Sequence, residues 1–400
     1  MSAIDATFAE TSAVDEASLR EALEYVGVPL RLEQWNTEAS ADAIRHYAMG
    51  IGDPNPLWQD ESYARDSAPG VIVAPPTFLY SVYIGFAPGL PGLPAYLRRV
   101  DWRFLDWVRR GDQLAASVSL RDAALVENKH GAKRIHQYAR AEYSRTTAGG
   151  ASTLIARSDD TVVRPPGPGH PGALAYEPRP EYGYSEAELA DIERAVLAVR
   201  RRGPQPRYWD DVEAGDQVDR IVKGPYTRMT MLCYHMGAAG APNYRAFDIW
   251  WHNRHLAETD PGALPATTIN SSAYAGTGVT PLGHHDSGIA QILGMPGVYD
   301  NGPQRTGLLA NCLTNWMGDH GFLYRLTHDL RAPVILGDTL FIEGTVTGKP
   351  AALDDDQGTE PAPLVDLSGH GPVEIELTAT SQLGQVVSTA TAVVLLPRRS

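Results

Sequence analysis

Two short segments carry the side chains that could move protons. The first, GDPNPLWQD, presents a carboxylate at Asp53 and an indole at Trp58. The second, GHHDS, places two imidazoles at His284 and His285. An imidazole changes its charge near neutral pH and can serve as a general acid or base, whereas an indole exchanges no proton there. The residue types therefore predict acid-base chemistry in the second segment.

These two segments belong to an internal repeat. Trp58 and His284 are 226 positions apart, because 284 minus 58 is 226. Three pairs of landmarks share this interval: Trp58-Gln59-Asp60 with His284-His285-Asp286, Ala74-Pro75-Pro76 with Asp300-Asn301-Gly302, and Gly111-Asp112 with Gly337-Asp338. Agreement of several landmarks at one interval indicates a duplicated structural unit.

Each copy has the same order of predicted elements. An amphipathic segment, ADAIRHYAMGIG in the first copy, leads to a Pro-rich turn, a helix over PPTFLYSVYIGF, and then strands rich in β-branched and aromatic residues. In the second copy we predict strands over 323–334, 338–349, 373–382 and 385–396, with Gly384 in the last turn. One helix followed by a meander of long strands is typical of an α+β unit in which a sheet wraps a helix.

The composition between the copies changes sharply. Residues 166–184 are dense in Pro and Gly and predict a surface linker. A helix follows it, with Ser185 and Glu188 at capping-box spacing and its end near Gly203. The predicted organisation has four parts: a flexible N-terminus over 1–24, a repeat over 25–165, the linker and helix over 166–204, and a repeat over 205–398.

Composition and charge exclude several partners. The chain of 400 residues is 43% hydrophobic, carries a net charge of −14, and shows no concentrated basic face, so we expect no nucleic-acid partner. Cys233 and Cys312 lack metal or redox spacing and are predicted to be buried thiols of a reducing compartment. No apolar run is long enough for a membrane span, so a cytoplasmic protein is expected. His252 and His255 lack carboxylate or cysteine neighbours at ligand spacing, so neither a metal nor another cofactor is predicted.

The segments AIRHYAMGIGDPNPLWQDESYARDSAPGVIVAPPTFL, GHHDSGIAQILGMPGVYDNGPQR and RAPVILGDTL resemble the MaoC-like acyl dehydratases and enoyl-CoA hydratases, specifically their FAS1-like N-terminal dehydratase type. The resemblance spans nearly the whole chain. It implies an α+β double hot-dog fold, in which each repeat is an antiparallel sheet wrapped around a central helix. It also implies a hydro-lyase that adds or removes water at C2–C3 of an acyl thioester carried by coenzyme A or an acyl-carrier protein.

In that family an aspartate and a histidine on one loop hold a water, and an amide at the start of the central helix polarises the thioester carbonyl. The Asp-x4-His pattern falls on Asp53 and Trp58 in the first copy, and on Val279 and His284 in the second. One half of the pair remains in each repeat. We expect Trp58 to fill the first site and the second repeat to keep the chemistry.

The resemblance then assigns roles in the second repeat. His284 is the first candidate for the general acid/base, with His285 as the neighbouring alternative, and the Gly302 amide is the candidate oxyanion donor. Asp286 and Asp300 are candidate orienting carboxylates, although Asp286 could equally be the N-cap of the helix that follows it. A histidine bonded within the domain interface is the alternative for His284.

Further candidates surround these positions. Asp53 remains a secondary catalytic candidate. Arg305, one turn into the predicted helix, could bind a carboxylate or phosphate or could brace the interface, and Trp250 belongs to an aromatic insertion expected to line an acyl pocket. The predicted substrate-binding residues are Asn55, Trp58, Tyr299, Asn301, Gln304, Arg305 and Trp250.

Two other functions stay open. A repurposed hot-dog enzyme could act as a cyclase, isomerase or dehydratase on a natural-product intermediate without a carrier. A non-catalytic binding subunit would need a second hot-dog chain to supply the missing acid. Self-association into a homo-oligomer is compatible with each of these functions.

Overall fold

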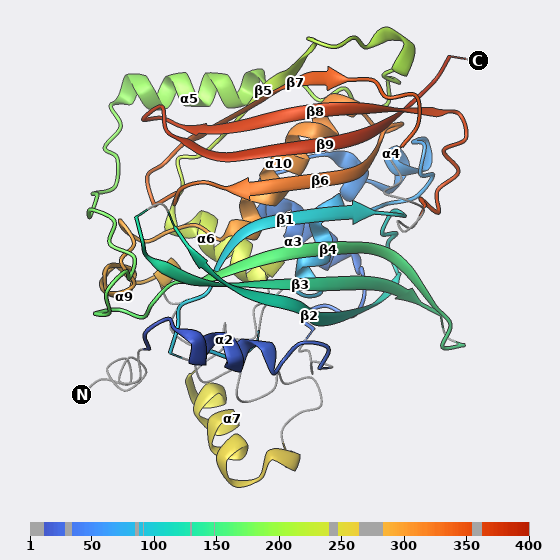
Figure 1. The fold of residues 1–400 in the computed structure, drawn as a ribbon. Helices are drawn as coiled ribbons and strands as arrows, with labels where there is room; N and C mark the ends of the chain where they lie inside the picture. Colours follow the sequence, from blue (N-terminus) through green and yellow to red (C-terminus); the bar gives the residue numbers. More distant parts are fainter. Residues whose placement is uncertain are drawn as a thin grey trace.

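The fold centres on one nine-stranded sheet with the strand order β2-β3-β4-β1-β6-β9-β8-β7-β5 (Figure 1). The computed structural model describes residues 12–28, 34–84, 88–90, 92–128, 130–147, 149–239, 247–263, 283–353 and 362–399. Every neighbouring pair of strands in the sheet is antiparallel. Strands β1 to β4 come from the first copy and β5 to β9 from the second, so the two sheets continue into one another.

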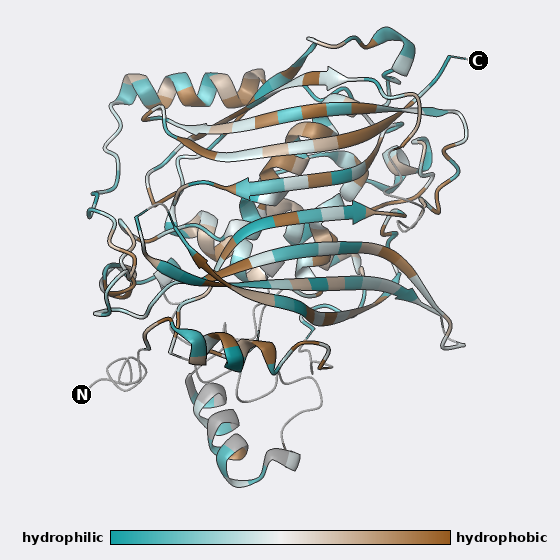
Figure 2. Cartoon of the chain, in the orientation of Figure 1, coloured by the Kyte–Doolittle hydropathy of each residue, from teal (hydrophilic) through white to brown (hydrophobic). Residues whose placement is uncertain are grey.

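The strands are long and alternate in burial, as a sheet with one face on a core requires. Figure 2 shows this alternation of hydrophilic and hydrophobic residues along the strands. In the first copy the strands are β1 (Tyr96–Phe104), β2 (Gln113–Glu127), β3 (Lys133–Thr146) and β4 (Ser152–Arg164). In the second copy they are β5 (Gln217–Lys223), β6 (Phe322–Leu330), β7 (Leu340–Gly348), β8 (His370–Ser381) and β9 (Val386–Pro397).

Helices α3 (Ala41–Gly50) and α10 (Gly302–Met317) lie behind the sheet in the view of Figure 1. All residues of α10 except Gly302 and Asn315 are buried, which makes it the central helix of the second repeat. It ends at Gly318, whose φ of 73° is a left-handed conformation that glycine adopts without strain. The other helical segments are α2 (Glu16–Leu23), η1 (Pro56–Trp58), α4 (Glu61–Arg65), η2 (Pro76–Ser81), α5 (Glu186–Ala198), η3 (Trp209–Asp211), α6 (Arg228–Tyr234), the π-helix η4 (His235–Ala239), α7 (Phe247–Thr259), η5 (Pro261–Ala263) and α9 (Ser287–Ile292).

Local sequence signals explain several boundaries. The capping box of α5 forms as predicted, with the Ser185 hydroxyl accepting from the Glu188 amide and the Glu188 carboxylate accepting from the Ser185 amide. The helix ends at Ala198, earlier than predicted. Gly384, with a φ of 75°, lies in the turn between β8 and β9, as expected.

Three expectations are corrected. Of the helix predicted over 75–86, residues 75–84 are described and form only the short 3₁₀ helix η2, in a segment rich in aromatic and β-branched residues of weak helix propensity. Residues 85 and 86 lie outside the described residues. Part of the N-terminus predicted to be flexible forms α2, which is capped by Asp15 and buries Ala22 against the sheet. Cys233 is exposed, whereas Cys312 is buried.

Strands β1 and β6 meet at a pseudo-twofold axis. Their bounds are related by the interval found in the sequence, since 322 minus 96 and 330 minus 104 are both 226. In their antiparallel register Asp101 lies opposite Thr327, and 327 minus 101 is again 226. Each repeat therefore contributes the same strand to the seam, as in the isologous interface of a symmetric dimer.

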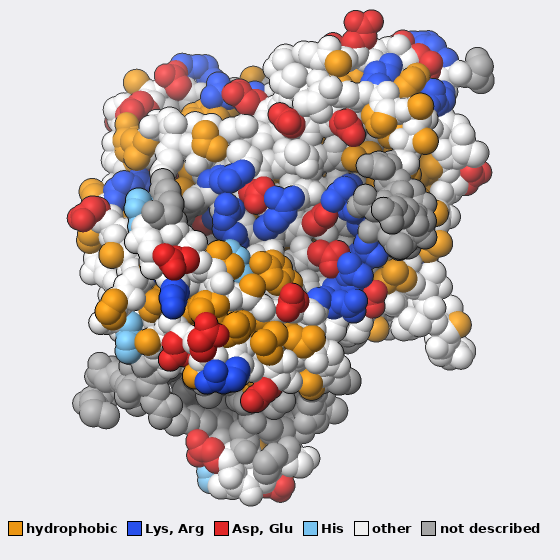
Figure 3. Space-filling model, in the orientation of Figure 1, with side chains coloured by type: hydrophobic (Ala, Val, Ile, Leu, Met, Phe, Trp, Pro, Cys, Tyr) orange, Lys and Arg blue, Asp and Glu red, His pale blue; other side chains and the backbone are white. Residues whose placement is uncertain are grey.

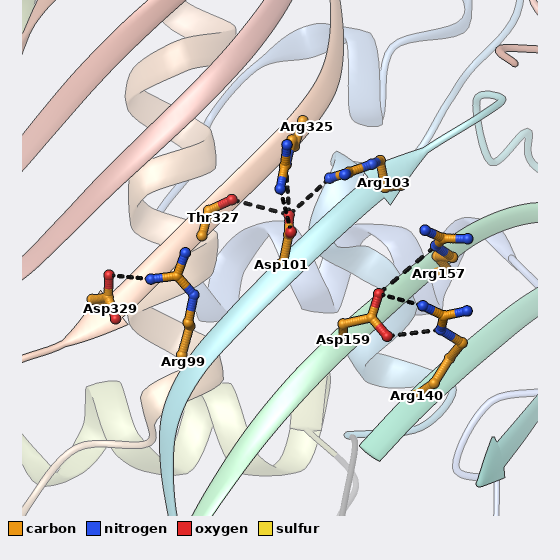
Figure 4. Close-up of polar contacts among 9 residues, drawn as sticks. All are labelled: Arg99, Asp101, Arg103, Arg140, Arg157, Asp159, Arg325, Thr327 and Asp329. Carbon is orange, nitrogen blue, oxygen red and sulfur yellow. Dashed lines mark hydrogen bonds and ion pairs between the residues drawn. The ribbon is translucent and has the colours of Figure 1, made fainter. Parts of the chain in front are cut away.

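Charged side chains cover the outer face of this seam (Figures 3 and 4). The Asp101 carboxylate accepts hydrogen bonds from Arg325 at 2.9 and 2.6 Å, from Arg103 at 3.0 Å and from the Thr327 hydroxyl at 3.0 Å. Burial alone would raise the pKa of Asp101, but the bonds from Arg325 and the charge of Arg103 outweigh it and hold that pKa below its usual range. One carboxylate thus joins two arginines of different repeats.

We expect Asp101→Asn to lower the free energy of unfolding by about 1–3 kcal/mol, because it leaves Arg103 and Arg325 facing each other without their anion. Urea denaturation followed by circular dichroism would measure this loss. The matched control is Asp159→Asn, which breaks the more exposed pair with Arg140 and should cost less than about 1 kcal/mol. An equal loss of unfolding free energy in both variants would show that the position of Asp101 on the pseudo-twofold axis adds no stability.

Candidate active site

A cleft of about 400 Å³ opens between the two repeats at the N-terminus of α10. Its walls are largely apolar, with a few polar and charged side chains among them. Of the predicted site residues, His284, Tyr299, Asp300, Asn301, Gly302 and Arg305 line it. The first repeat contributes its wall through β1 and β4: Tyr96, Leu97, Arg98, Val162 and Val163.

His284 is the imidazole that reaches this cleft. Its Nδ1 lies 2.8 Å from the backbone oxygen of Tyr299, and its ring centroid lies 4.5 Å from that of the Tyr299 side chain. An Nδ1–H that donates to a carbonyl fixes the tautomer and leaves Nε2 with a lone pair. Burial lowers the pKa of His284 to about 4. The ring is therefore neutral at physiological pH and can accept a proton at Nε2.

A third histidine adjoins this ring. His235, at the start of η4, is buried, and its centroid lies 5.2 Å from that of His284 and 4.8 Å from that of His285. The Nε2 atom of His235 lies 3.2 Å from Nδ2 of the Asn301 side chain. Burial lowers its pKa well below the usual value. His235 is not among the predicted site residues, because its long separation from His284 gives no local signal.

Gly302 begins α10 directly on the cleft wall. A Cβ at this position would lie 2.6 Å from Cδ2 of Leu330, so a larger residue would force the Leu330 side chain to shift. The first N–H groups of an α-helix have no partner within the helix and carry partial positive charge. The start of α10 can thus stabilise an oxygen on which negative charge develops.

Two predicted substrate-binding residues, Arg305 and Gln304, are bound to other parts of the protein. The Nε of Arg305 lies 2.6 Å from Oδ2 of Asp300, and Nη1 donates to the Ala332 and Val387 carbonyl oxygens at 2.9 and 3.0 Å. Both partners of this ion pair are buried, and burial raises the pKa of Asp300 although the Arg305 charge opposes the shift. Gln304 donates from Nε2 to the Gly50 oxygen of α3 at 2.9 Å and does not line the cleft. These contacts hold Arg305 and Asp300 in place within the second repeat, and Arg305 also lines the cleft.

Asp286 and His285 serve local structure. Asp286 is the N-cap of α9, where its carboxylate accepts from the Ile289 amide at 2.9 Å. The backbone oxygen of His285 accepts from Arg228 at 2.7 Å, and its side chain does not line the cleft. Val279 lies outside the described residues, as does the side chain of Trp250 on α7.

The first repeat has a second, much smaller cavity of about 40 Å³. Asn55 and Trp58 line it, and so do Phe322 and Leu323 of β6. These two residues of β6 are 226 positions after Tyr96 and Leu97 of β1, which line the large cleft. The two cavities are therefore pseudo-symmetric equivalents, and each is built from both repeats.

Trp58 lines the small cavity, and its indole donates a hydrogen bond to Asp53, the acidic residue that remains of the Asp-x4-His pattern. Its Nε1 donates to Oδ2 of Asp53 at 2.9 Å, while Oδ1 accepts from the Asn55 amide at 3.1 Å. Asp53 is 4% exposed, and burial raises its pKa. Lys223 of the second repeat ties the same loop by donating to the backbone oxygens of Ile51 and Gly52. Asp53 thus lies in a separate site from His284 and serves to fix the loop.

Among the residues that the structure describes, no group of three or more His, Cys, Asp or Glu side chains is arranged to hold a metal ion. In the same part of the chain, no helix combines the length and apolar character needed to cross a bilayer.

Comparisons with known proteins agree with this architecture. Residues 24–146 match the family model described as the FAS1-like, dehydratase domain region. A solved MaoC-like dehydratase superposes with a TM-score of 0.58 at 18% identity, covering 95% of this chain and all of that one (100%). A MaoC domain protein dehydratase from Chloroflexus aurantiacus superposes with a TM-score of 0.53 at 13% identity, covering 94% and 96% of the two chains. A UPF0336 protein of Streptomyces avermitilis is 36% identical over 45 residues, which is 11% of this chain and only 30% of that protein.

The predicted fold class is confirmed: the chain has an α+β double hot-dog fold. Residues 24–146 are similar to the FAS1-like dehydratase domain region, and the resemblance to the MaoC-like dehydratases is confirmed at the level of the fold.

We expect Trp58→Ala to lower the free energy of unfolding by about 3–5 kcal/mol, because it removes a buried indole from a closed site. Trp58→Phe should cost less in packing but leaves Oδ2 of Asp53 without its N–H donor, at about 1–3 kcal/mol. Chemical denaturation of both variants measures these values.

Trp58→His restores the Asp-x4-His pattern in the first repeat, but the wild-type cavity there is only about 40 Å³, and the ring it would gain lacks the large cleft that His284 lines. We expect no second activity from it. Turnover that survives when His284→Ala is added to Trp58→His would contradict this expectation.

Proposed function

We propose that the second repeat carries a hydro-lyase site that adds or removes water at C2–C3 of an acyl thioester. The single observation that carries this proposal is the placement of His284 and Gly302 on the wall of one cleft between the repeats. A proton acceptor and a helix start that stabilises an oxyanion are the two groups that such chemistry requires.

In the dehydration direction, Nε2 of His284 removes the proton from C2 of a 3-hydroxyacyl thioester. The electron pair moves toward the thioester carbonyl oxygen, which lies at the N-terminus of α10. The C3–O bond then breaks, and the imidazolium returns the proton to the leaving hydroxyl, so that water and the 2,3-enoyl thioester are formed. One histidine thereby acts first as base and then as acid, and hydration is the reverse sequence.

The cleft also suits a carrier with phosphates. Arg98, Arg134 and Arg331 line it together with the apolar wall, and arginine matches phosphate geometry. Arg98 is partly held by the Leu330 oxygen, and Arg331 by the Thr389 hydroxyl. Coenzyme A carries such phosphates beyond its pantetheine arm, and we infer that it is the carrier.

We expect His284→Gln to lower kcat by about a hundredfold or more if the ring is the acid/base, with little change in the unfolding transition. The measurement is loss or gain of the 2,3-double-bond absorbance with 2-butenoyl-CoA and a panel of longer enoyl-CoAs. His285→Asn is the matched control, because the side chain of His285 lies outside the cleft. If His285→Asn is inactive and His284→Gln is not, the assignment must move to His285.

Silence of the folded wild-type protein across a broad panel of thioesters would argue against the hydro-lyase function. Assays with carrier-free substrates and co-purification with a second hot-dog chain would then test the two remaining functions.

The pH profile tests the electrostatics of the site. Because burial lowers the pKa of His284 to about 4 from the ordinary 6.5, the ring stays in its basic form down to moderately acidic pH. We expect kcat/KM for hydration to be flat through pH 6.5 and to fall only toward about pH 4, as the ring becomes protonated. Measurement over the range in which circular dichroism shows folded protein would reveal a midpoint near 6.5 if the ring were not desolvated.

A further inference from the structure

The linker between the repeats packs closely on the second repeat. In Figure 1 the chain leaves β4 and passes α9 before it reaches α5. The Tyr176 amide donates to the Gly294 oxygen at 2.9 Å, and the Arg179 amide donates to the Pro296 oxygen at 2.8 Å. The segment thus binds by its backbone to the turn after α9.

A partly buried ion pair anchors the middle of this segment. Arg179 donates to both oxygens of Asp338 at 2.8 and 2.7 Å, and the Asp338 side chain is 1% exposed. The same carboxylate accepts from the Ile335 amide at 2.9 Å. Further along, the Tyr184 and Thr339 hydroxyls lie 2.7 Å apart. The linker is therefore held at several successive points.

The packing leaves no space for a side chain at two glycines. A Cβ on Gly294 would lie 1.8 Å from the Leu174 backbone oxygen, and a Cβ on Gly337 would lie 2.6 Å from the Tyr182 nitrogen. Gly294 also has a φ of 73°. Any other residue at 294 would have to push the linker away from the second repeat.

This position makes the linker a wall of the cleft. Leu174 and Tyr176 line the same cleft as His284, facing Met295 and Tyr299 of the second repeat and Tyr96 of the first. Leu174 also packs against the apolar cluster that contains Met295 and Tyr299. Neither repeat alone encloses the cleft on this side.

The aromatic residues of the lining indicate the occupant. Three tyrosines line the cleft, Tyr96, Tyr176 and Tyr299, together with the thioether of Met295, and Tyr176 is 44% exposed. The rings of Tyr96 and Tyr299 have centroids 6.3 Å apart at 57°, a tilted arrangement that offers both faces and edges. Aromatic rings and sulfur attract another ring beyond simple area burial. The carboxylate that lines the cleft, Asp300, is paired with Arg305, so a cationic acyl group finds no free anion among the described lining residues.

We propose that Leu174 and Tyr176 of the linker complete an acyl subsite that selects a ring-bearing acyl group without positive charge. This inference rests on the proposed function for its kinetic test. It assigns acyl selection to a segment outside both hot-dog repeats.

The kinetic test compares three enoyl-CoAs in hydration: 2-butenoyl, 2-octenoyl and 5-phenylpent-2-enoyl, whose ring is not conjugated with the reacting double bond. For the wild-type protein we expect kcat/KM to favour the phenyl substrate over 2-octenoyl by about tenfold, as one or two aromatic contacts provide. Tyr176→Ala should reduce that ratio several-fold. Gly183→Ala is the control within the linker, since a Cβ there meets nothing within 4 Å.

A binding test separates this inference from the proposed function. Calorimetry with the saturated thioesters 5-phenylpentanoyl-CoA and octanoyl-CoA needs no catalysis. Equal affinity of the wild-type protein for both thioesters, or the same preference in Tyr176→Ala as in wild type, would overturn the subsite even if the protein is an active hydratase. A ring preference that Tyr176→Ala removes would support the subsite even if no turnover is found.

A structural variant tests the wall itself. Gly294→Ala should release the linker, increase limited cleavage by chymotrypsin after Tyr176, and reduce the preference for the phenyl thioester. Gly169→Ala is its matched control, because Gly169 has a φ of 85° but open space around it. If Gly294→Ala fails to fold, Leu174→Ala tests the same wall by removing one of its side chains. Unchanged thioester preference in a folded Gly294→Ala or in Leu174→Ala would count against the wall.

Discussion

The antiparallel pairing of β1 with β6 is the contact on which the rest of the molecule depends. It places two copies of one strand on either side of a pseudo-twofold axis, with Asp101 opposite Thr327. The concave side of the joined sheet then holds α10, and the starts and ends of the seam strands become walls of the cavities. Because Asp101 binds arginines of both repeats, the register that positions the cleft is also fixed electrostatically.

The two equivalent sites have diverged in opposite directions. In the first, an indole occupies the space beside the carboxylate, and Nε1 of Trp58 turns Asp53 into a structural acceptor. In the second, the imidazole of His284 keeps access to a large cleft, while its Nδ1 is oriented by a backbone oxygen instead of a side-chain carboxylate. A neutral ring held in this way can begin as a base, which is the state that proton removal from C2 requires.

Much of the fold was predictable because its signals are local. The strands of the second copy, the Ser185 capping box and the Gly384 turn follow from patterning, cap chemistry and turn chemistry that neighbouring residues determine. Of the candidate site, His284 and Gly302 could be placed by the repeat interval and the family resemblance.

The remaining features depend on contacts between distant residues. A helix is predicted over 75–86, but the core buries Phe78 and Tyr80 from the short 3₁₀ helix η2. The ion pair of Arg305, the bond from Gln304 to α3 and the approach of His235 to His284 arise only when separate elements pack. The linker has the Pro- and Gly-rich composition of a flexible connection, and no residue pattern in it predicts the close contact between Leu174 and Gly294.

The pseudo-symmetry of the two cavities has a genetic consequence. In a homodimer of single hot-dog chains, every substitution is expressed at both active sites at once, so a change that improves one role cannot be separated from its cost in the other. Here positions 58 and 284 vary independently although they are structurally equivalent. Selection can therefore act on the two sites separately, because each substitution changes only one of the two equivalent sites in a molecule.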